Sequence, residues 1–328
     1  MNEPATTAGL RDRIGRVDRD RVLRWNRDNG VYVALVLIIL YNLAFTPHFV
    51  TWDNLSVQLV LATKVIVVSL GMAMVIGTGG IDLSVGAVMA LSGALLVQFS
   101  AVPEVVAILV ALLAGALVGL LNGSLVSIVG VQPIVATLAF LFAGRSIAQL
   151  LLTGMNPSIR DETLVLQISS GSILGVSGLI VAALVAAVIV LAVMRRTTFG
   201  RRVLAVGDNH RASFLSGVPV NRTLIGVYIL SGVLAAWAGV MDTASITSAN
   251  ALSSGLNYEL FAITAVVVGG TPLTGGRVRV IGTVAAAILM QLLKSTLVFH
   301  SATDAIAQIV TAVVIVAAVY IQRARARA

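Results

Sequence analysis

Long stretches of apolar residues, separated by short polar segments, dominate this chain. A helix that crosses a membrane needs about 20 predominantly apolar residues, and most of the stretches approach that length. Ten such stretches are present, at residues 31–45, 59–78, 84–100, 104–127, 131–153, 172–194, 223–246, 258–272, 279–299 and 304–321. The first and the eighth are short. The pattern predicts an all-α polytopic membrane protein with about ten transmembrane helices.

Composition excludes several other classes of protein. Of the 328 residues, 58% are hydrophobic and 11% are charged, whereas soluble domains carry about 25% charged residues. An ordinary soluble enzyme and most nucleic-acid-binding proteins are excluded, because a soluble chain of this length needs far more polar surface. The chain has no cysteine, and His48, His210 and His300 show no metal-ligand spacing. We therefore expect no metal site, no other cofactor and no nucleic-acid partner.

The distribution of basic residues predicts the orientation of the chain. The net charge is +8, and 18 of the 22 Lys and Arg residues fall in four segments that share one side when ten spans are counted. These segments are a polar arm at 1–30, the loop 195–222, the loop with Arg277 and Arg279, and a tail at 323–328. Arg160 is the one basic residue in the loops of the other side. Because Lys and Arg are retained in the cytoplasm, we expect a membrane domain at 31–322 with both termini cytoplasmic.

Three basic residues fall inside predicted spans. Lys64 and Lys294 lie near the outer ends of their spans, where a long side chain can extend toward the lipid headgroups. Arg145 lies deeper, with Gln149 one turn further on. A charge near the centre of a span is costly, so Arg145 is expected to form an internal ion pair or to face an aqueous path.

Further polar residues are candidates for a translocation path. Asn122 and Gln132 lie within or beside predicted spans and, together with Arg145 and Gln149, complete this set of candidates. Amide side chains suit a hydroxylated solute because they both donate and accept hydrogen bonds.

The stretch GMAMVIGTGGIDLSVGAVMALSGA interrupts two predicted spans with a glycine-rich break. Gly79 and Gly80 permit backbone conformations that end a helix, and Asp82 or Ser84 can cap the helix that continues through Gly86. One interpretation is therefore a capped turn. The other is a break that lines a path or contacts a partner, because irregular backbone at membrane depth requires protein or water around it.

Small residues recur at every fourth position of the fourth span. They are Ala111, Gly115, Gly119, Gly123 and Ser127. Such a stripe lets two helices approach closely in lipid. We interpret it as a packing surface, and a direct role in the translocation path is the alternative.

Catalytic motifs are not supported by the sequence. A phosphate-binding loop needs a Gly-rich turn followed by Lys and Ser or Thr, but Lys64 and Lys294 are the only lysines and neither follows such a turn. The string GVSG at 175–178 resembles the serine motif of rhomboid-type intramembrane proteases. A serine nucleophile needs a nearby base, and no histidine lies well inside a span. The chain is not expected to be an enzyme.

Several segments resemble the ribose/galactose-type sugar permeases of ABC importers. The segments are GGIDLSVGAVMALSGA, VQPIVATLAFLFAGRSIAQL at 131–150, GRRVLAVGDNHRASFLSGVPV at 200–220 and AITAVVVGGTPLTGGRVRVIGTVAAA at 262–287. They follow the order of the family from about residue 55 onward. The arm at 1–30 carries no such resemblance.

The resemblance implies a fold, a set of partners and a location. The fold is an ABC importer permease that resembles the type II arrangement, in the inner membrane of a bacterium. The partners are a cytoplasmic ABC ATPase, an extracytoplasmic sugar-binding protein and a second permease, identical or paralogous. The implied cargo is a monosaccharide of the pentose or hexose class.

The loop 195–222 is the expected contact with the ATPase. A short helix over 209–216 is predicted, with Asp208 as its cap, Gly217 at its end and Pro219 preventing its continuation. The candidate residues are Gly200, Gly207, Asp208, Asn209, Arg211, Ala212, Ser213 and Gly217. Arg211-Ala212-Ser213 stands where the family often has small residues alone. The alternative is a solvated basic loop without a partner.

Two glycine-rich strings resemble each other. GGIDLSVG at 79–86 and GGTPLTGG at 269–276 align at an offset of 190 residues. This similarity indicates two related halves, as many transporters have, or a convergence of two turns.

A secondary transporter driven by an ion gradient is the main alternative function. Such a protein usually places acidic residues deep in several spans. Asp82 is the only strong candidate here, because Asp242 lies near the end of a span. A membrane scaffold without transport activity is the third possibility.

Overall fold

The computed structural model describes residues 29–153, 171–173 and 175–301, together with short runs between 303 and 316. The basic tail and almost all of the N-terminal arm lie outside the described residues. The same holds for half of the predicted last span at 304–321.

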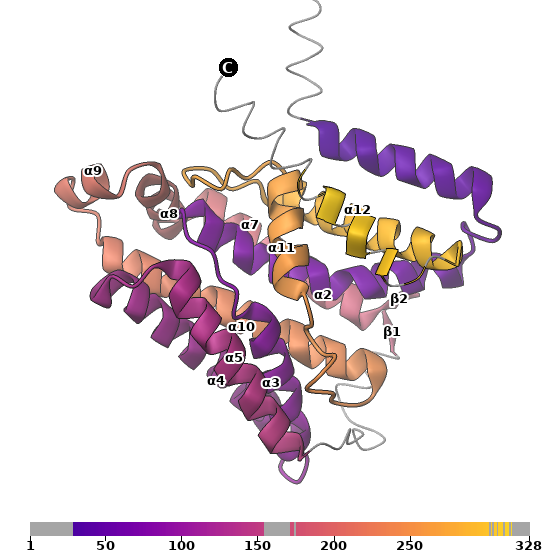
Figure 1. Cartoon of the computed structure of the whole chain (residues 1–328), viewed down its shortest axis with the longest axis horizontal. Coiled ribbons are helices and arrows are strands. Elements are labelled where there is room, and N and C mark those ends of the chain that lie inside the picture. The colour runs from indigo at the N-terminus through magenta and orange to yellow at the C-terminus, as the bar shows by residue number, and fades with distance from the viewer. Residues whose placement is uncertain are drawn as a thin grey trace, which may run out of the picture.

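The described chain is almost entirely helical (Figure 1). A first helix, Asn29–Phe45, precedes α2 Trp52–Gly77, α3 Val85–Gln98, α4 Glu104–Ser124, a π-helical turn at Leu125–Val129, α5 Pro133–Leu152 and α7 Gly178–Arg196. After these come α8 Thr198–Asp208, α9 His210–Leu215, α10 Val220–Ile246, α11 Tyr258–Val268 and α12 Val280–Phe299. Two short strands, β1 Ser172–Ile173 and β2 Val176–Ser177, pair antiparallel, with Ser172 opposite Ser177.

Six described helices are long and apolar enough to cross a membrane. They are Trp52–Gly77, Glu104–Val129, Pro133–Leu152, Gly178–Arg196, Val220–Ile246 and Val280–Phe299. Three shorter apolar helices, at Asn29–Phe45, Val85–Gln98 and Tyr258–Val268, match the remaining predicted stretches before residue 300. The fold is that of an all-α polytopic membrane protein, as the sequence predicts.

One predicted span begins later than expected. The stretch 172–194 was expected to be helical throughout, but the β1–β2 hairpin occupies its first residues. Gly175 turns the hairpin with φ of +81°, a conformation that favours glycine. Ser177 then accepts a hydrogen bond from the backbone N–H of Leu179 and caps α7.

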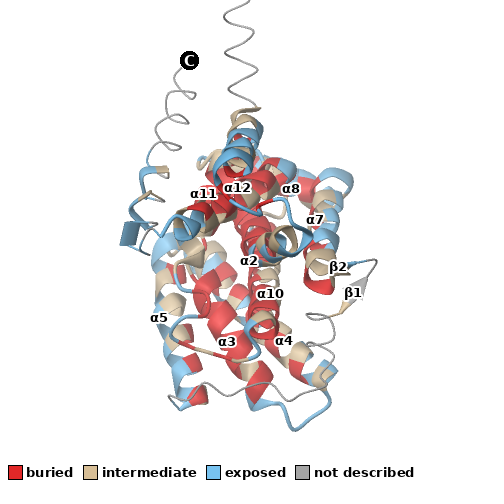
Figure 2. Ribbon diagram, turned by 90° about the vertical axis from the view of Figure 1, so that its right-hand side faces the viewer, coloured by how far each residue is buried: buried red, intermediate tan, exposed pale blue. Residues whose placement is uncertain are grey.

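The helix α2 forms the centre of the bundle. All of its residues from Ala62 to Gly77 are buried, and α7, α10, α11 and α12 pack around it. Figure 2 shows the buried residues concentrated in the inner helices, while α5 and α7 turn one face outward. A helix enclosed on every side is expected to be apolar all round, and the buried part of α2 meets that condition apart from Thr63, Lys64 and Ser69.

The stripe of small residues on α4 packs against α10. A Cβ atom at Gly119 would collide with the backbone of Tyr228 and lie 2.7 Å from Cα of Ile229. Gly115 and Gly123 face α10 in the same way, toward Gly232 and Ile225. Burial from water does not drive helix association in lipid, so close backbone approach has to supply the contact energy. The interpretation of the stripe as a packing surface is confirmed.

Lys64 does not extend toward the membrane surface as expected. Its side chain is buried, and Nζ lies 2.9 Å from Oδ1 of Asp242 and 3.1 Å from Oγ of Ser245. The second oxygen of Asp242 accepts a hydrogen bond from Ser254 at 2.8 Å. The expectation was wrong because α2 is surrounded by helices at this level, so Lys64 meets the carboxylate of α10 instead of lipid. Lys294 is exposed, with Nζ 5.7 Å from the ring centre of Phe261.

We predict that Gly119→Leu destabilises the bundle strongly. Overpacking a close contact costs about 1–3 kcal/mol and more when backbone blocks relaxation, and both neighbours of this position are backbone atoms. The matched control is Leu117→Phe, an enlargement on the exposed face of the same helix. Thermal unfolding of the purified proteins in detergent measures the difference. Equal unfolding temperatures for the two variants would contradict the packing role of the stripe.

We also predict that Lys64→Met destabilises the protein more than the double variant Lys64→Met/Asp242→Leu does. Removing one partner of a buried pair leaves an uncompensated charge and costs about 3–5 kcal/mol, whereas replacing both partners is often neutral. Lys294→Met serves as the control because it removes an exposed lysine. The free energies of unfolding of the unaltered protein and the three variants test this pattern. A double variant that is destabilised as much as Lys64→Met, or more, would refute the coupling.

Candidate functional site

The loop 195–222 folds into two helices at one end of the bundle, on the left of Figure 1. Thr197 caps α8 by accepting a hydrogen bond from the backbone N–H of Gly200 at 3.2 Å. Val203 and Val206 are spaced to lie on one face of α8 and are fully buried, whereas Arg201 and Arg202 are exposed. The segment is therefore an ordered amphipathic element that packs on the spans.

The short helix α9 is capped by Asn209, not by Asp208. Oδ1 of Asn209 accepts a hydrogen bond from the backbone N–H of Ala212 at 2.9 Å. The prediction was off by one residue because α8 continues through Asp208, so the extended residue that precedes α9 is Asn209, with φ of −154°. Gly217 ends the helix with φ of +79° and, as predicted, Pro219 stands before the next helix.

The exposed side of α9 is apolar at its tip. Phe214 is 71% exposed and Leu215 is 77% exposed, while Ser213 is buried and Arg211 and Ala212 are exposed. Exposure of two large apolar side chains to water is unfavourable, and here both lie at the end of a six-residue helix. Exposed apolar patches mark contacts with another protein or with a membrane.

Glycines join this loop to the break after α2. The backbone N–H of Gly276 donates a hydrogen bond to the carbonyl of Gly77 at 3.0 Å. A Cβ atom at Gly275 would lie 2.8 Å from the carbonyl oxygen of Gly207 and 2.9 Å from the backbone N of Gly79. We call this contact of Gly77, Gly79, Gly207, Gly275 and Gly276 the glycine junction. It connects the end of α2, the end of α8 and the loop after α11.

The two similar strings form the same turn. Gly79 has φ of +83° and Gly270 has φ of +93°. The next backbone N–H bonds five residues back in both cases, from Gly80 to Val75 and from Thr271 to Val266. This is the Schellman arrangement that ends a helix.

The equivalence of the two turns corrects the sequence alignment by one residue. The left-handed glycines correspond at an offset of 191, whereas the strings align at 190. The chain then diverges, because α3 begins six residues after Gly79 and α12 begins ten residues after Gly270. The likeness is that of two helix ends, and nothing further along the two loops extends it.

Asp82 anchors the break to two other helices. Its Oδ1 accepts hydrogen bonds from the backbone N–H and the Oγ of Ser84, at 3.0 and 2.6 Å. Its Oδ2 accepts one from Oγ of Ser231 on α10 at 2.8 Å, and Ser84 in turn accepts one from Nδ2 of Asn122 on α4 at 3.0 Å. All four side chains are buried. The expected cap is therefore only partly formed, since Ser84 makes no side-chain bond to the helix that it precedes.

The same cluster contains polar atoms without partners among the described residues. They are Oδ1 of Asn122 and Oη of Tyr228. Tyr228 is held beside the break, because a Cβ atom at Gly80 would lie 2.7 Å from its hydroxyl. Gly86 is close-packed on the other side, next to Gly255 and Glu259. Protein therefore surrounds the polar side chains of the break, although Gly79 itself is exposed. Neighbouring atoms require glycine at Gly80 and Gly86, and the positive φ requires it at Gly79.

The four path candidates do not form one site. Gln132 and Gln149 lie at opposite ends of α5, and both are exposed. Arg145 is half-buried between them, and Asn122 belongs to the cluster around Asp82. The buried residues of α5, such as Ala136 and Ala148, face α3. The exposed Gln132 and Gln149 therefore lie away from that contact, whereas Arg145 reaches a neighbouring segment of the chain.

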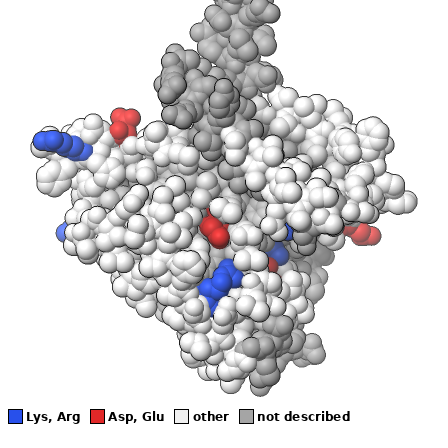
Figure 3. Space-filling model, viewed as in Figure 1, with Lys and Arg blue, Asp and Glu red and all other residues white. Residues whose placement is uncertain are grey.

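Arg145 holds a loop instead of forming a short ion pair. Its guanidinium donates to the carbonyls of Ala251 and Leu252, at 3.1 and 3.2 Å, within the segment that joins α10 to α11. Glu259 interacts with it electrostatically over a longer distance. In Figure 3, one acidic and one basic group lie close together in the middle of an otherwise nearly uncharged face.

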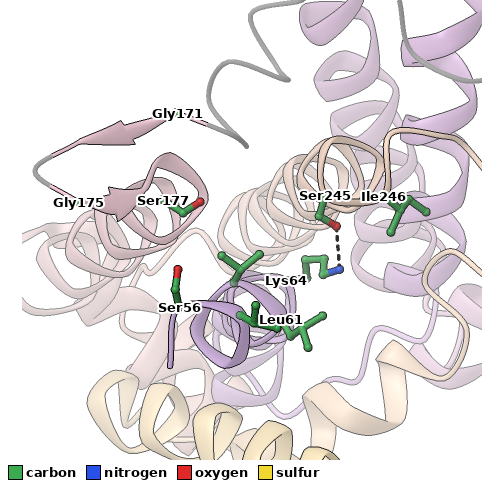
Figure 4. Close-up of a pocket in the computed structure, with 10 residues that line it drawn as sticks. Ser56, Leu61, Lys64, Gly171, Gly175, Ser177, Ser245 and Ile246 are labelled. Carbon is green, nitrogen blue, oxygen red and sulfur yellow. Dashed lines mark hydrogen bonds between the residues drawn. The ribbon is translucent and has the colours of Figure 1, made fainter. Parts of the chain in front are cut away.

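A pocket of about 430 Å³ opens at the other end of the bundle (Figure 4). Lys64 and Ser245 line it on one side, and Gly175 and Ser177 of the hairpin line it on the other. No histidine is among the described residues that line the pocket, so none is there to act as a base for Ser177, the serine of the GVSG string. The Oγ of this serine caps α7 instead. A protease site is therefore not supported. No group of three His, Cys, Asp or Glu residues that could hold a metal occurs among the described residues.

Several of these contacts were not predicted from the sequence. The Lys64–Asp242 pair joins residues that are 178 positions apart, and no local pattern indicates such a pairing. The glycine junction was partly signalled, because both similar strings and Gly207 belong to the segments that carry the family resemblance.

Comparison with known proteins identifies the family. Residues 54–319 match the family described as branched-chain amino acid transport system / permease component. The galactofuranose transporter permease protein YtfT of Escherichia coli is 36% identical, covering 93% of this chain and 92% of that protein. The ribose import permease protein RbsC of Bacillus subtilis is 35% identical, covering 90% and 92%.

A third relative, the fructose import permease protein FruF of Bifidobacterium longum, is 32% identical over 81% of this chain and 79% of that protein. No solved structure matches the chain. The family model matches residues 54–319, which include every described helix after the first, apart from Trp52 and Asp53 at the start of α2, and the first two relatives cover 90% or more of this chain. The chain belongs to the permease family of these transport systems, and it is a membrane-spanning permease component.

Proposed function

We propose that this chain is the permease subunit of an ATP-driven ABC importer that carries a monosaccharide of the pentose or hexose class. The relatives are named for ribose, fructose and galactofuranose, which supports this class of cargo. In this proposal an extracytoplasmic binding protein delivers the sugar, and a cytoplasmic ABC ATPase hydrolyses ATP. The subunit resides in the inner membrane of a bacterium with both termini in the cytoplasm.

The observation that carries the proposal is the exposed tip of α9 at the end of an ordered loop. Phe214 and Leu215 offer an apolar knob, and Arg211 adds a positive charge beside it. Such a knob fits a cleft on a partner protein, where its burial stabilises the complex. A solvated basic loop without a partner does not explain these two exposed side chains.

The glycine junction provides a route from α9 to the core. A force on α9 reaches α8 through the single residue Asn209 between them. From the end of α8 it passes through Gly207 to Gly77 and to Gly276, where backbone meets backbone. Contacts without intervening side chains leave little freedom to absorb a displacement. The end of α2, at the centre of the bundle, therefore moves with the loop.

In the same proposal, the unpacked face of α5 lines the translocation path. Polar side chains on a spanning helix are costly in lipid and usually face water or protein. Gln132 and Gln149 are exposed with large apolar residues such as Phe142 and Leu150, and the half-buried Arg145 lies at the edge of this face. A second permease, identical or paralogous, placed against α5 covers the apolar part and leaves the amides toward a shared path.

An ion-gradient mechanism has weaker support. Asp82 is the buried carboxylate that such a mechanism requires, but both of its oxygens accept hydrogen bonds from serines. Asp242 is paired with Lys64. These carboxylates hold helices together, which is a structural use.

We predict that Phe214→Ala/Leu215→Ala disrupts binding of the co-expressed ATPase. Truncating a side chain that dominates an interface costs about 2 kcal/mol or more. If Phe214 and Leu215 are such residues, as we propose, the amount of ATPase that co-purifies should fall at least tenfold. The control variant is Phe45→Ala/Val50→Ala, which removes two side chains of similar exposure at the opposite end of the bundle. Comparable ATPase recovery with both double variants would contradict the assignment of α9.

Reconstituted vesicles distinguish the two energy sources. We expect sugar uptake to require ATP and to persist when H⁺ and Na⁺ gradients are dissipated by ionophores. The purified chain alone should show no ATP hydrolysis. Uptake that survives ATP depletion and collapses with an ion gradient would establish the alternative function, and ATPase activity in the isolated chain would refute the proposal.

A further inference from the structure

A second pocket, of about 400 Å³, lies at the end of the bundle that carries α8 and α9. It opens between the first helix, the end of α7 and the start of α12. Three guanidinium groups line it, from Arg195, Arg277 and Arg279, and no acidic residue is among the described lining residues. We call it the arginine pocket.

Two of the arginines, Arg195 and Arg277, carry no salt bridge within the part of the chain that the structure describes. Both are exposed. Arg279 is held in place, because its backbone N–H donates to Oγ1 of Thr271 at 2.9 Å and its side chain packs over Gly270. The like charges of Arg195 and Arg277 at one cavity repel each other, and an anion bound there offsets that repulsion.

The backbone at the start of α12 adds to this positive field. Val280, Ile281 and Gly282 line the pocket as the first residues of a 20-residue helix. The first N–H groups of a helix lack internal partners and carry the positive end of its dipole. Arginine forks and free N–H groups together match the oxygen atoms of a phosphate.

The position of the pocket indicates which kind of phosphate-containing molecule it binds. Arg195 is in the last turn of α7 and Ile281 is in the first turn of α12, so the pocket lies where two spans end. Tyr32 lines it as well, and aromatic rings of this kind favour the interface of a membrane. Ile281 and Leu191 form an apolar wall on the membrane side of the arginines. A ligand with a phosphate and acyl chains fits both parts.

We propose that the arginine pocket binds the headgroup of an anionic phospholipid. Basic pockets between helices at the cytoplasmic side are suited to such headgroups. Leu204 of α8 is also part of the lining, so a bound lipid contacts the helix that leads to α9. The lipid then stabilises the position of α8 as well as the contact between α7 and α12.

The test uses the full-length protein in detergent, with thermal unfolding followed while phosphatidylglycerol or phosphatidylcholine is added. We expect phosphatidylglycerol to raise the unfolding temperature and phosphatidylcholine to have little effect. In Arg195→Gln/Arg277→Gln, the phosphatidylglycerol concentration that gives half of the shift should rise about tenfold or more. Arg195→Lys/Arg277→Lys keeps both charges and should retain most of the response, which shows that the site is intact.

The matched control is Arg196→Gln/Arg222→Gln. It removes two exposed arginines from the same end of the bundle, and neither lines the pocket. We expect it to respond as the unaltered protein does. An equal loss of response in both glutamine variants would overturn the proposal, because it would show a general effect of charge. A shift of the same size with millimolar inorganic phosphate would also overturn it, since the ligand would then be a soluble anion.

Native mass spectrometry provides a second measurement that does not depend on stability. Phosphatidylglycerol should remain bound to the unaltered protein and to the Arg196→Gln/Arg222→Gln control. It should be largely lost from Arg195→Gln/Arg277→Gln. Equal retention by all three proteins would place the lipid elsewhere and refute the site.

Discussion

Close contact between backbones, made possible by glycine, is the interaction on which this structure depends. In a membrane the lipid chains are as apolar as the side chains, so helices gain little from burying apolar surface against each other. They gain from dispersion contacts over short distances, which larger side chains would prevent. The α4–α10 contact and the glycine junction both follow this rule. The first holds two spans together, and the second connects the bundle to the loop that carries α9.

Hydrogen bonds and an ion pair between buried polar groups determine which faces of the helices pack together. The hydrogen bonds of Asp82 reach α10 through Ser231 and α4 through Ser84 and Asn122, and the Lys64–Asp242 pair connects α2 to α10. A polar group in an apolar medium must find its partner or lose several kcal/mol. Such groups therefore specify which faces of the helices meet, whereas glycines specify how near they come.

The sequence predicted those features that local chemistry determines. Long apolar stretches located the spans, four-residue spacing located the packing face of α4, and Gly217 located the end of α9. The cap of α9 was misplaced because Asp208 and Asn209 are both good capping residues, and the last turn of α8 decides between them. The β1–β2 hairpin was missed because its residues are as apolar as those of a span.

Contacts between distant segments could not be predicted in this way. Lys64 near the end of an apolar stretch looks the same whether lipid or a carboxylate lies beside it. Gln132, Arg145 and Gln149 were grouped because of their polarity, but the pitch of α5 separates the two glutamines by the length of the helix. The family resemblance supplied the class of function, and it carried no information on which side chains touch.

The exposed tip of α9 has a consequence for the life of the protein in the cell. A subunit that has not yet met its partner presents Phe214 and Leu215 to water, and patches of this kind favour aggregation and recognition by chaperones and proteases. In the proposed complex, the abundance of this chain would then depend on the supply of the ATPase that covers the tip. Permease without that partner would be open to removal, which would keep the two subunits in proportion.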